Sequence, residues 1–200
     1  MFWDQVAGVY DLFEDMYNGR VYRGLGKQLA AIIAPDDIVL ECACGTGAIT
    51  TAIAPKCKKL VATDYSAGML RQVMKKCRDL PNVAVRRADI LRLNCKANRF
   101  DKVIAGNVIH LLDRPHAAVA ELYRVCKPGG KVIIPTYVNL TGKNNWDKPL
   151  IRLFDLSGAN FKRHFDAASY QHFFLDAGYA NTSFFIIRGR MPCAVAVITK

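Results

Sequence analysis

Apolar residues in the first part of the chain recur at the spacing of amphipathic helices. One helix is expected over about residues 3–17, and a second from about residue 20 to residue 34. The second helix carries four apolar side chains on one face, namely Val21, Leu25, Leu29 and Ile32. Pro35 follows this pattern and ends the helix.

From residue 38 onward, short apolar runs alternate with helical patterns. The runs predict strands at residues 38–40, 59–63, 83–87, 100–105 and 131–135. Helices are expected between them over residues 48–54, 66–79 and 115–126, with Ser66 as an N-cap and Pro115 in a first turn. This alternation predicts an α/β fold in which a parallel sheet has helices on both faces.

The last third of the chain has a different pattern. Residues 137–165 are polar, aromatic and irregular, whereas residues 167–177 predict a helix that Gly178 closes. Two strands follow at about residues 181–188 and 193–199, and the short connection between them requires an antiparallel hairpin. Because no repeat or linker divides the sequence, we expect residues 1–200 to form one domain.

A glycine turn follows the first predicted strand. Its residues are Glu41-Cys42-Ala43-Cys44-Gly45-Thr46-Gly47. Glycines at such a place let the backbone turn sharply and approach a ligand closely. A dinucleotide-binding turn needs a third small residue three positions after Gly47, where this chain has Thr50. The turn therefore predicts a ligand site, but its pattern does not require that the ligand contain a pyrophosphate.

Polar residues also follow the next three predicted strands. Asp64 ends the second strand, Asp89 and Ile90 follow the third, and Asn107 and His110 follow the fourth. In an open parallel sheet the carboxyl ends of the strands meet at one crevice, where ligands bind. A carboxylate at the second strand can accept hydrogen bonds from a ribose diol, and one at the third can bind the amine of an adenine.

These segments together resemble the motifs of class I S-adenosylmethionine-dependent methyltransferases. Residues 41–47 are similar to motif I, residues 64–70 to the acidic loop and its helix, and residues 88–90 to the adenine-contacting motif. Residues 100–112 resemble motif IV, and residues 122–130 resemble the segment before the fifth strand. The opening at residues 6–11 is similar to that of ubiquinone- and menaquinone-biosynthesis methyltransferases, which have a methyltransferase type 11 domain.

The resemblance implies a Rossmann-like, seven-stranded, mostly parallel sheet with an antiparallel C-terminal strand. It also implies that S-adenosyl-L-methionine is the cofactor and that a methyl group passes to a small-molecule acceptor by in-line displacement, without a metal. His110 is the candidate catalytic residue, which would orient the acceptor or take its proton. The implied cofactor-binding residues are Glu41, Cys44, Gly45, Gly47, Asp64, Tyr65, Met69, Asp89, Ile90 and Asn107.

Aromatic segments flank the expected cofactor-binding core at residues 35–135. We expect a lid over the crevice, built from the N-terminal helices within residues 1–34 and from the insert at 136–165, while residues 166–200 add a helix and the hairpin. Alternatively, the N-terminal aromatic residues pack against the sheet as ordinary core. The candidate acceptor-binding residues are Trp3, Tyr10, Tyr17, Arg23 and Tyr137.

The net charge of +11 is compatible with RNA or an anionic membrane as a partner. Methylation of RNA or of a phospholipid amine is therefore an alternative function. Two observations count against RNA: the basic residues are spread along the chain, and residues 106–109 lack the Pro-Pro-aromatic segment of adenine-amine methyltransferases. A cofactor-binding module without transfer activity is a further alternative. We expect a small-molecule substrate and no nucleic-acid partner, and we leave open a transient contact with an anionic membrane.

The seven cysteines include no C-x-x-C pair, so we expect reduced, mostly buried thiols and no zinc site. No apolar run approaches the ~20 residues of a membrane span. The first residues lack the pattern of a secretory signal, and a cytoplasmic location is expected.

Overall fold

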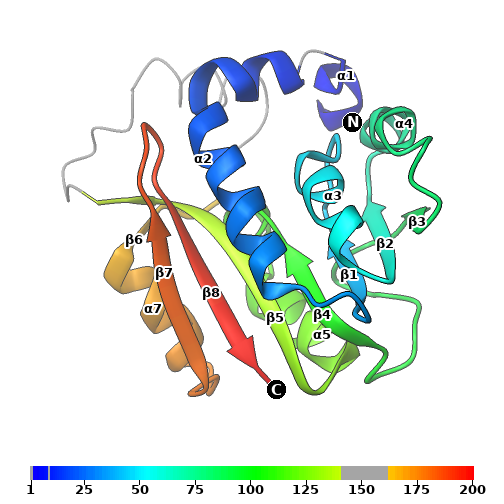
Figure 1. The fold of residues 1–200 in the computed structure, drawn as a ribbon. Coiled ribbons are helices and arrows are strands. Elements are labelled where there is room, and N and C mark those ends of the chain that lie inside the picture. Colours follow the sequence, from blue (N-terminus) through cyan, green and yellow to red (C-terminus); the bar gives the residue numbers. More distant parts are fainter. Residues whose placement is uncertain (1, 9, 141–161) are drawn as a thin grey trace.

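A twisted sheet forms the centre of the computed structural model, which describes residues 2–8, 10–140 and 162–200 and, for residues 2 and 10–17, the backbone alone. The strand order is β3-β2-β1-β4-β5-β8-β7. The strands are β1 (Ile38–Cys42), β2 (Lys59–Asp64), β3 (Val83–Arg87), β4 (Phe100–Ala105), β5 (Cys126–Asn139), β7 (Thr182–Ile187) and β8 (Cys193–Thr199). The first five are parallel, and β8 is antiparallel to both its neighbours (Figure 1). The predicted Rossmann-like α/β fold is confirmed.

An eighth strand adds to the seven that were predicted. β6 (Phe165–Asp166) pairs in parallel with the end of β5, at Val138 and Asn139. β5 itself continues beyond the predicted end at residue 135. A strand of two residues has no periodicity of its own, so the sequence pattern could not reveal β6.

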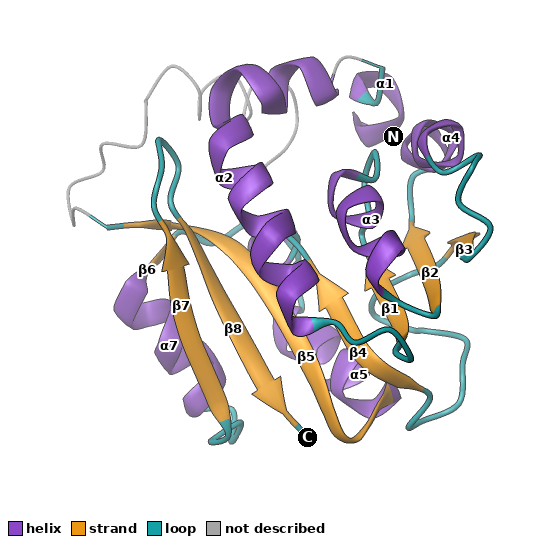
Figure 2. Ribbon diagram, viewed as in Figure 1, coloured by secondary structure: helices purple, strands orange, loops and turns teal. Residues whose placement is uncertain are grey.

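Helices cover both faces of the sheet, as the alternating pattern predicts (Figure 2). On one face, α2 (Tyr10–Ile32) and α3 (Ala48–Ile53) pack through Leu25, Leu29 and Ile53. On the other face, α5 (Pro115–Val125) and α7 (Ala167–Leu175) pack through Leu122 and Phe174. The remaining helical segments are α1 (Phe2–Val6), α4 (Ala67–Lys76), η1 (Ala54–Lys56) and η2 (Ile109–Leu111).

The N-terminal helices divide at a different place from the one predicted. The first helix ends at Val6 rather than near residue 17, and α2 then runs through the predicted boundary with a kink at Asn18 (φ −142°, ψ 19°). The Asn18 amide pairs with the backbone of Met191, at 3.1 Å to the carbonyl and 3.4 Å to the N–H. This contact ties the kink to the loop between β7 and β8, and a contact over such a sequence distance gives no local signal.

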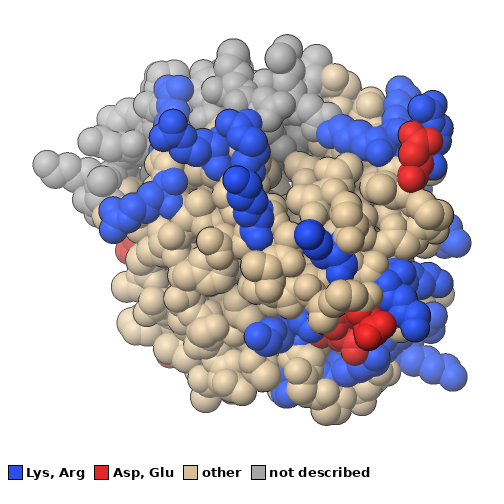
Figure 3. Space-filling model, in the orientation of Figure 1, with Lys and Arg blue, Asp and Glu red and all other residues tan. Residues whose placement is uncertain are grey.

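Lysine and arginine side chains form several separate groups on the face shown in Figure 3. Among the described helices, none combines the length and apolar content that a bilayer crossing requires. All seven cysteines are free thiols, and six of them are buried, as the sequence predicts.

We predict that the two helical layers contribute comparably to stability. Leu29 on α2 and Leu122 on α5 are both fully buried, so Leu29→Ala and Leu122→Ala should each lower the free energy of unfolding by about 2–5 kcal/mol. Leu175 on α7 is 42% exposed and serves as the matched control, with an expected loss below about 1 kcal/mol. Urea denaturation measures all three, and an equal loss in the control would contradict the assigned layers.

Candidate functional site

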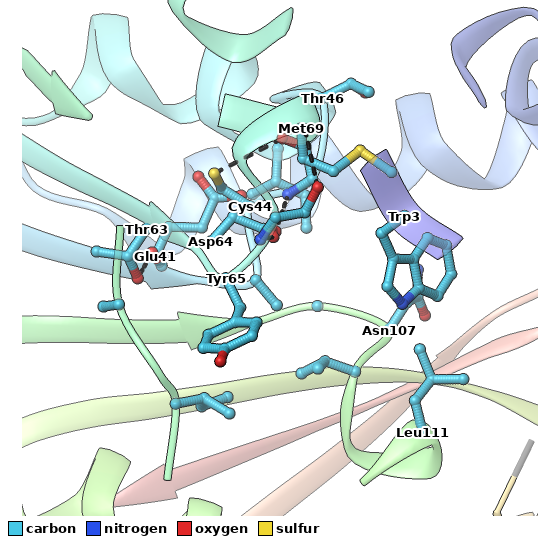
Figure 4. A pocket seen from close by; sticks show the side chains of 18 of the residues that line it. Trp3, Glu41, Cys44, Thr46, Thr63, Asp64, Tyr65, Met69, Asn107 and Leu111 are labelled. Atoms are coloured by element: carbon cyan, nitrogen blue, oxygen red, sulfur yellow. Dashed lines mark hydrogen bonds between the residues drawn. The ribbon is translucent and has the colours of Figure 1, made fainter. Parts of the chain in front are cut away.

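A pocket of about 350 Å³ lies at the carboxyl ends of the central strands. Its walls come from the loops after β1, β2, β3 and β4, and from α1, α2 and α4. In Figure 4, Trp3, Asn107 and Leu111 lie on one side, and Glu41, Thr63 and Tyr65 lie on the other. The lining residues are Trp3, Tyr22, Glu41, Ala43, Cys44, Gly45, Thr46, Ala48, Ile49, Thr63, Asp64, Tyr65, Ser66, Met69, Ala88, Asp89, Ile90, Gly106, Asn107, Val108, Leu111 and Leu112.

The glycine turn after β1 brings backbone to the floor of this pocket. Ala43, Gly45 and Gly47 have φ values of +52°, +54° and +92°. The turn thus forms with Ala43 in the left-handed region, where alanine is disfavoured by roughly 1–2 kcal/mol. Gly47 does not line the pocket: a Cβ there would lie 2.6 Å from Val73, so this glycine permits the close approach of α4.

Asp64 connects two of the loops that form the pocket. One carboxylate oxygen accepts the Gly45 N–H at 2.9 Å, and the other accepts the Ser66 N–H at 2.8 Å. Burial raises the pKa of this carboxyl group although backbone hydrogen bonds from Ser66, Gly45 and Tyr65 act against the shift.

Glu41 is a buried carboxyl group beside the glycine turn. Its Oε2 accepts a hydrogen bond from the Thr50 hydroxyl at 2.6 Å, so the residue that departs from the dinucleotide pattern has a specific partner here. Burial raises the pKa of Glu41 to about 8, the Thr50 hydrogen bond opposes this shift, and the nearby Asp64 adds to it. A cationic ligand would favour the ionised form, whereas a pyrophosphate beside this group would be repelled.

Tyr65 from the loop after β2 and Asp89 and Ile90 from the loop after β3 all line the pocket. The Asp89 carboxylate accepts the Leu91 N–H at 2.9 Å and remains exposed, while Ile90 is buried. The Tyr65 ring is 52% exposed and has the Arg87 guanidinium 5.1 Å from its centre. This pairing of an exposed carboxylate with an apolar surface suits the edge and face of a planar heterocycle.

Helix α1 holds Trp3 at the opposite wall. One Asp4 carboxylate oxygen accepts the Ser66 hydroxyl at 2.8 Å and the Gly68 N–H at 2.7 Å, at the first turn of α4. These bonds lower the pKa of Asp4. The N-terminal segment is thereby attached at Ser66, whose backbone N–H also donates to Asp64.

Ten of the sequence-predicted site residues line the pocket: Trp3, Glu41, Cys44, Gly45, Asp64, Tyr65, Met69, Asp89, Ile90 and Asn107. Gly47, His110, Tyr137 and Arg23 do not. Arg23 is exposed on α2, and the side chains of Tyr10 and Tyr17 lie outside the described residues. The sequence therefore located the floor of the pocket more completely than its outer wall.

His110 is buried behind the pocket rather than in its wall. Burial lowers the pKa of its imidazole to about 3, and His164 contributes in the same direction. The His110 carbonyl accepts the N–H groups of Lys162 and Arg163 at 2.9 and 3.1 Å. The residue thus connects the loop after β4 to the segment that leads into β6.

Tyr22 is the main lining residue that the sequence did not indicate. It lies on α2, and its hydroxyl is 3.3 Å from the Asn107 amide nitrogen and 2.5 Å from the Tyr137 hydroxyl. No local motif surrounds Tyr22, because its place in the site arises from the packing of α2 across the sheet. Thr63 and Ser66 were also missed, although they stand beside the motifs.

The charged side chains among the described lining residues are all acidic: Glu41, Asp64 and Asp89. They belong to the part of the pocket formed by the loops after β1, β2 and β3. The remaining part, with Trp3 and Leu111, is neutral and mostly apolar. The pocket as described therefore suits a cationic, ribose-bearing ligand next to an uncharged one.

Comparison with known proteins agrees with this geometry. Residues 40–134 match the family model described as a methyltransferase domain. Just under half of the chain is therefore similar to a methyltransferase domain. It is 32% identical over 141 residues to a demethylmenaquinone methyltransferase of Renibacterium salmoninarum, covering 70% of this chain and 58% of that protein.

A second relative has the same description. The demethylmenaquinone methyltransferase of Lactiplantibacillus plantarum is 32% identical over 139 residues, which cover 66% of this chain and 59% of that protein. The chain thus spans just under three-fifths of the length of these relatives. A solved putative S-adenosyl-L-methionine-dependent methyltransferase from Methanococcus maripaludis shares the fold, with a TM-score of 0.72, 18% identity and coverage of 100% of this chain and 94% of that one.

Glu41 should make the stability of the ligand-free protein depend on pH. Its folded-state pKa of about 8 exceeds the ordinary 4.5, so the folded state keeps a proton that the unfolded state loses between these values. Stability contributed by this group therefore falls as the pH rises through that window. We expect the free energy of unfolding of Glu41→Gln at pH 8 to exceed that of the wild type by on the order of a few kcal/mol, because one unit of pKa shift corresponds to about 1.4 kcal/mol. Its melting temperature should be higher accordingly.

Thermal melts between pH 5 and pH 8.5 measure this effect, and the advantage of Glu41→Gln should shrink toward pH 5. Glu121 provides a control of opposite sign, because its hydrogen bonds with Arg124 lower its pKa. Glu121→Gln should therefore lose stability at neutral pH. An advantage of Glu41→Gln that is equal at all pH values would contradict the assignment.

Proposed function

We propose that this chain transfers a methyl group from S-adenosylmethionine to a small, largely apolar acceptor. The observation that carries the proposal is the pocket itself, in which three carboxyl groups at strand ends adjoin a neutral apolar compartment. The family match and the demethylmenaquinone methyltransferases among the relatives support it. When bound, S-adenosylmethionine supplies a methyl group on a positively charged sulfonium, which needs little further activation.

The described residues fit the parts of this cofactor. The Asp64 carboxylate would accept the ribose hydroxyls, and Asp89 with Ile90 would hold the adenine. Glu41 would lie near the methionine part, where positive charge favours its ionised form. Cys44, Gly45, Tyr65 and Met69 would enclose the ligand, and Gly47 would shape the turn from below.

The acceptor compartment supports an uncharged substrate. Trp3, Val108, Leu111 and Leu112 contribute apolar surface there, and no described lining residue is cationic. RNA and phospholipid headgroups carry phosphate, which such a compartment would not stabilise. Catalysis would then consist mainly of positioning the acceptor while water is excluded.

His110 has a supporting role in this proposal. With a pKa of about 3, its imidazole is neutral at physiological pH and is a weak base. Its burial and its backbone bonds to residues 162–163 would hold the loop that carries Asn107 and Leu111.

The first test is cofactor affinity, measured by calorimetry with S-adenosylhomocysteine. Asp64→Ala should weaken binding by about 1–3 kcal/mol, because it removes a charged acceptor and releases the Gly45 N–H. Asp79→Ala is the matched control, since that carboxylate is fully on the surface beside Arg78. Absence of heat with the wild type, or equal affinity of Asp64→Ala and the control, would refute the proposed cofactor site.

The second test concerns α1 as part of a lid. A Cβ on Gly68 would lie 2.7 Å from the Asp4 Cα, so Gly68→Ala should detach α1 while favouring helix α4. We expect faster hydrogen exchange in residues 2–8 and roughly three- to tenfold weaker S-adenosylhomocysteine binding, at an unchanged melting temperature.

Gly8→Ala is the control for this substitution, because a Cβ at Gly8 meets nothing within 4 Å. If Gly68→Ala and Gly8→Ala have the same exchange and affinity, α1 does not cover the site. If Gly68→Ala unfolds the protein, the N-terminal segment belongs to the core instead.

A further inference from the structure

An exposed aromatic ring lines the pocket beside Asp64. Tyr65 directly follows β2, and it is 52% exposed although it belongs to the pocket wall. Figure 4 shows its ring projecting from the loop that also carries Asp64. A ring in such a place can turn about its side-chain bonds, so its value as a binding surface depends on what holds it.

Arg87 contacts Tyr65 in two ways. Its Nε–H donates to the Tyr65 carbonyl at 3.0 Å, and its guanidinium carbon lies 5.1 Å from the centre of the ring. The first contact fixes the backbone that carries the ring, and the second holds the ring itself. A cation over an aromatic face is attracted to it, and the planar guanidinium can also stack there, which a lysine ammonium cannot do.

The register of the sheet brings these two residues together. Asp64 on β2 pairs with Arg87 on β3, and the Ala88 N–H donates to the Asp64 carbonyl at 3.1 Å. Because side chains alternate along a strand, Arg87 shares the face on which Val85 packs against buried residues of α4. Arg86 belongs to the opposite face, where its guanidinium donates to the Val85 carbonyl at 3.0 Å.

The guanidinium supports the ring from outside the pocket. Among the described residues, Tyr65 is part of the wall and Arg87 is not. We therefore place Arg87 on the outer side of the ring, which leaves the side toward the pocket open. A flat heterocycle on that side would complete a stack of guanidinium, phenol and base, and stacking of a base on an aromatic ring stabilises binding.

We propose that Arg87 is a positioning residue that holds the Tyr65 ring at the pocket wall, so that the adenine of the cofactor stacks against it. This inference rests on the proposed methyl-transfer function. It extends the determinants of cofactor binding to the edge strand β3, outside the residues that line the pocket. In this role Arg87 acts on the ring, and its charge does not attract the ligand directly.

The first test is the affinity for S-adenosylhomocysteine, measured by calorimetry. Arg87→Gln should bind roughly three- to tenfold more weakly, because the ligand must then order the ring itself. Arg87→Lys keeps the charge but loses the planar stack and the Nε–H, so it should remain at least about threefold weaker than the wild type. Arg86→Gln is the matched control: it changes an equally exposed arginine of the same strand and should bind as the wild type does.

A double-mutant cycle identifies the ring as the intermediary. Tyr65→Leu removes the ring, and in that background Arg87→Gln should cause no further loss of affinity. A direct attraction between Arg87 and the carboxylate of the ligand would persist there. Because Tyr65 and Arg87 are both exposed, all these variants should keep the melting temperature of the wild type.

A spectroscopic measurement reports the stack in the bound state. Stacking lowers the ultraviolet absorbance of adenine, so wild type saturated with S-adenosylhomocysteine should absorb less than the sum of the separate components. Arg87→Gln and Tyr65→Leu should diminish this decrease at saturating ligand, whereas Arg86→Gln should keep it in full.

Equal affinities of Arg87→Gln and Arg86→Gln would overturn the inference, as would full recovery in Arg87→Lys. A loss on Arg87→Gln that is just as large in the Tyr65→Leu background would show instead that Arg87 acts on the ligand by charge. An undiminished absorbance change in Arg87→Gln would likewise contradict the positioning role. Failure of the wild type to bind S-adenosylhomocysteine would refute the proposed function itself.

Discussion

The carboxylate of Asp64 joins the parts of the molecule on which the site depends. Its two oxygens accept N–H groups from the glycine turn after β1 and from the start of α4, so two separate loops have one fixed spacing. Ser66 continues the connection to Asp4, and through it to α1 and Trp3. The floor of the pocket and its N-terminal wall at Trp3 are therefore linked through a few hydrogen bonds around one buried acid.

This arrangement divides the pocket by polarity. The strand ends of β1 to β3 place their carboxyl groups along one part of the pocket, and burial raises the pKa of Glu41 and Asp64. The loop after β4 and helix α1 supply neutral surface instead. In the proposed function, a cofactor with positive charge would relieve the acidic side and an uncharged acceptor would occupy the other, so charge would separate the two substrates within the pocket.

The surface charge has little bearing on this division. The net charge of +11 is spread over separate groups of side chains, and none of the described lining residues is cationic. The basic character of the chain therefore describes its surface, whereas the described lining of the pocket is acidic and apolar.

The sequence by itself determined the order of strands and helices, the glycine turn and the polar residues at the strand ends. These features are local, because neighbouring residues along the chain determine both the period of apolar positions and the spacing of a turn. It placed Asp64, Asp89 and Asn107 at one crevice because parallel strands end at the same edge.

Only the tertiary structure decided which side chains complete that crevice. Tyr22 and Asn18 act through partners 85 and 173 positions away, so no local pattern marks them. No local pattern marks the burial of His110 either. That burial lowers the pKa of the imidazole, and the residue lies outside the pocket wall. Burial and long-range hydrogen bonds depend on how α2 and β5 pack over the sheet, and that packing exists only once the chain has folded.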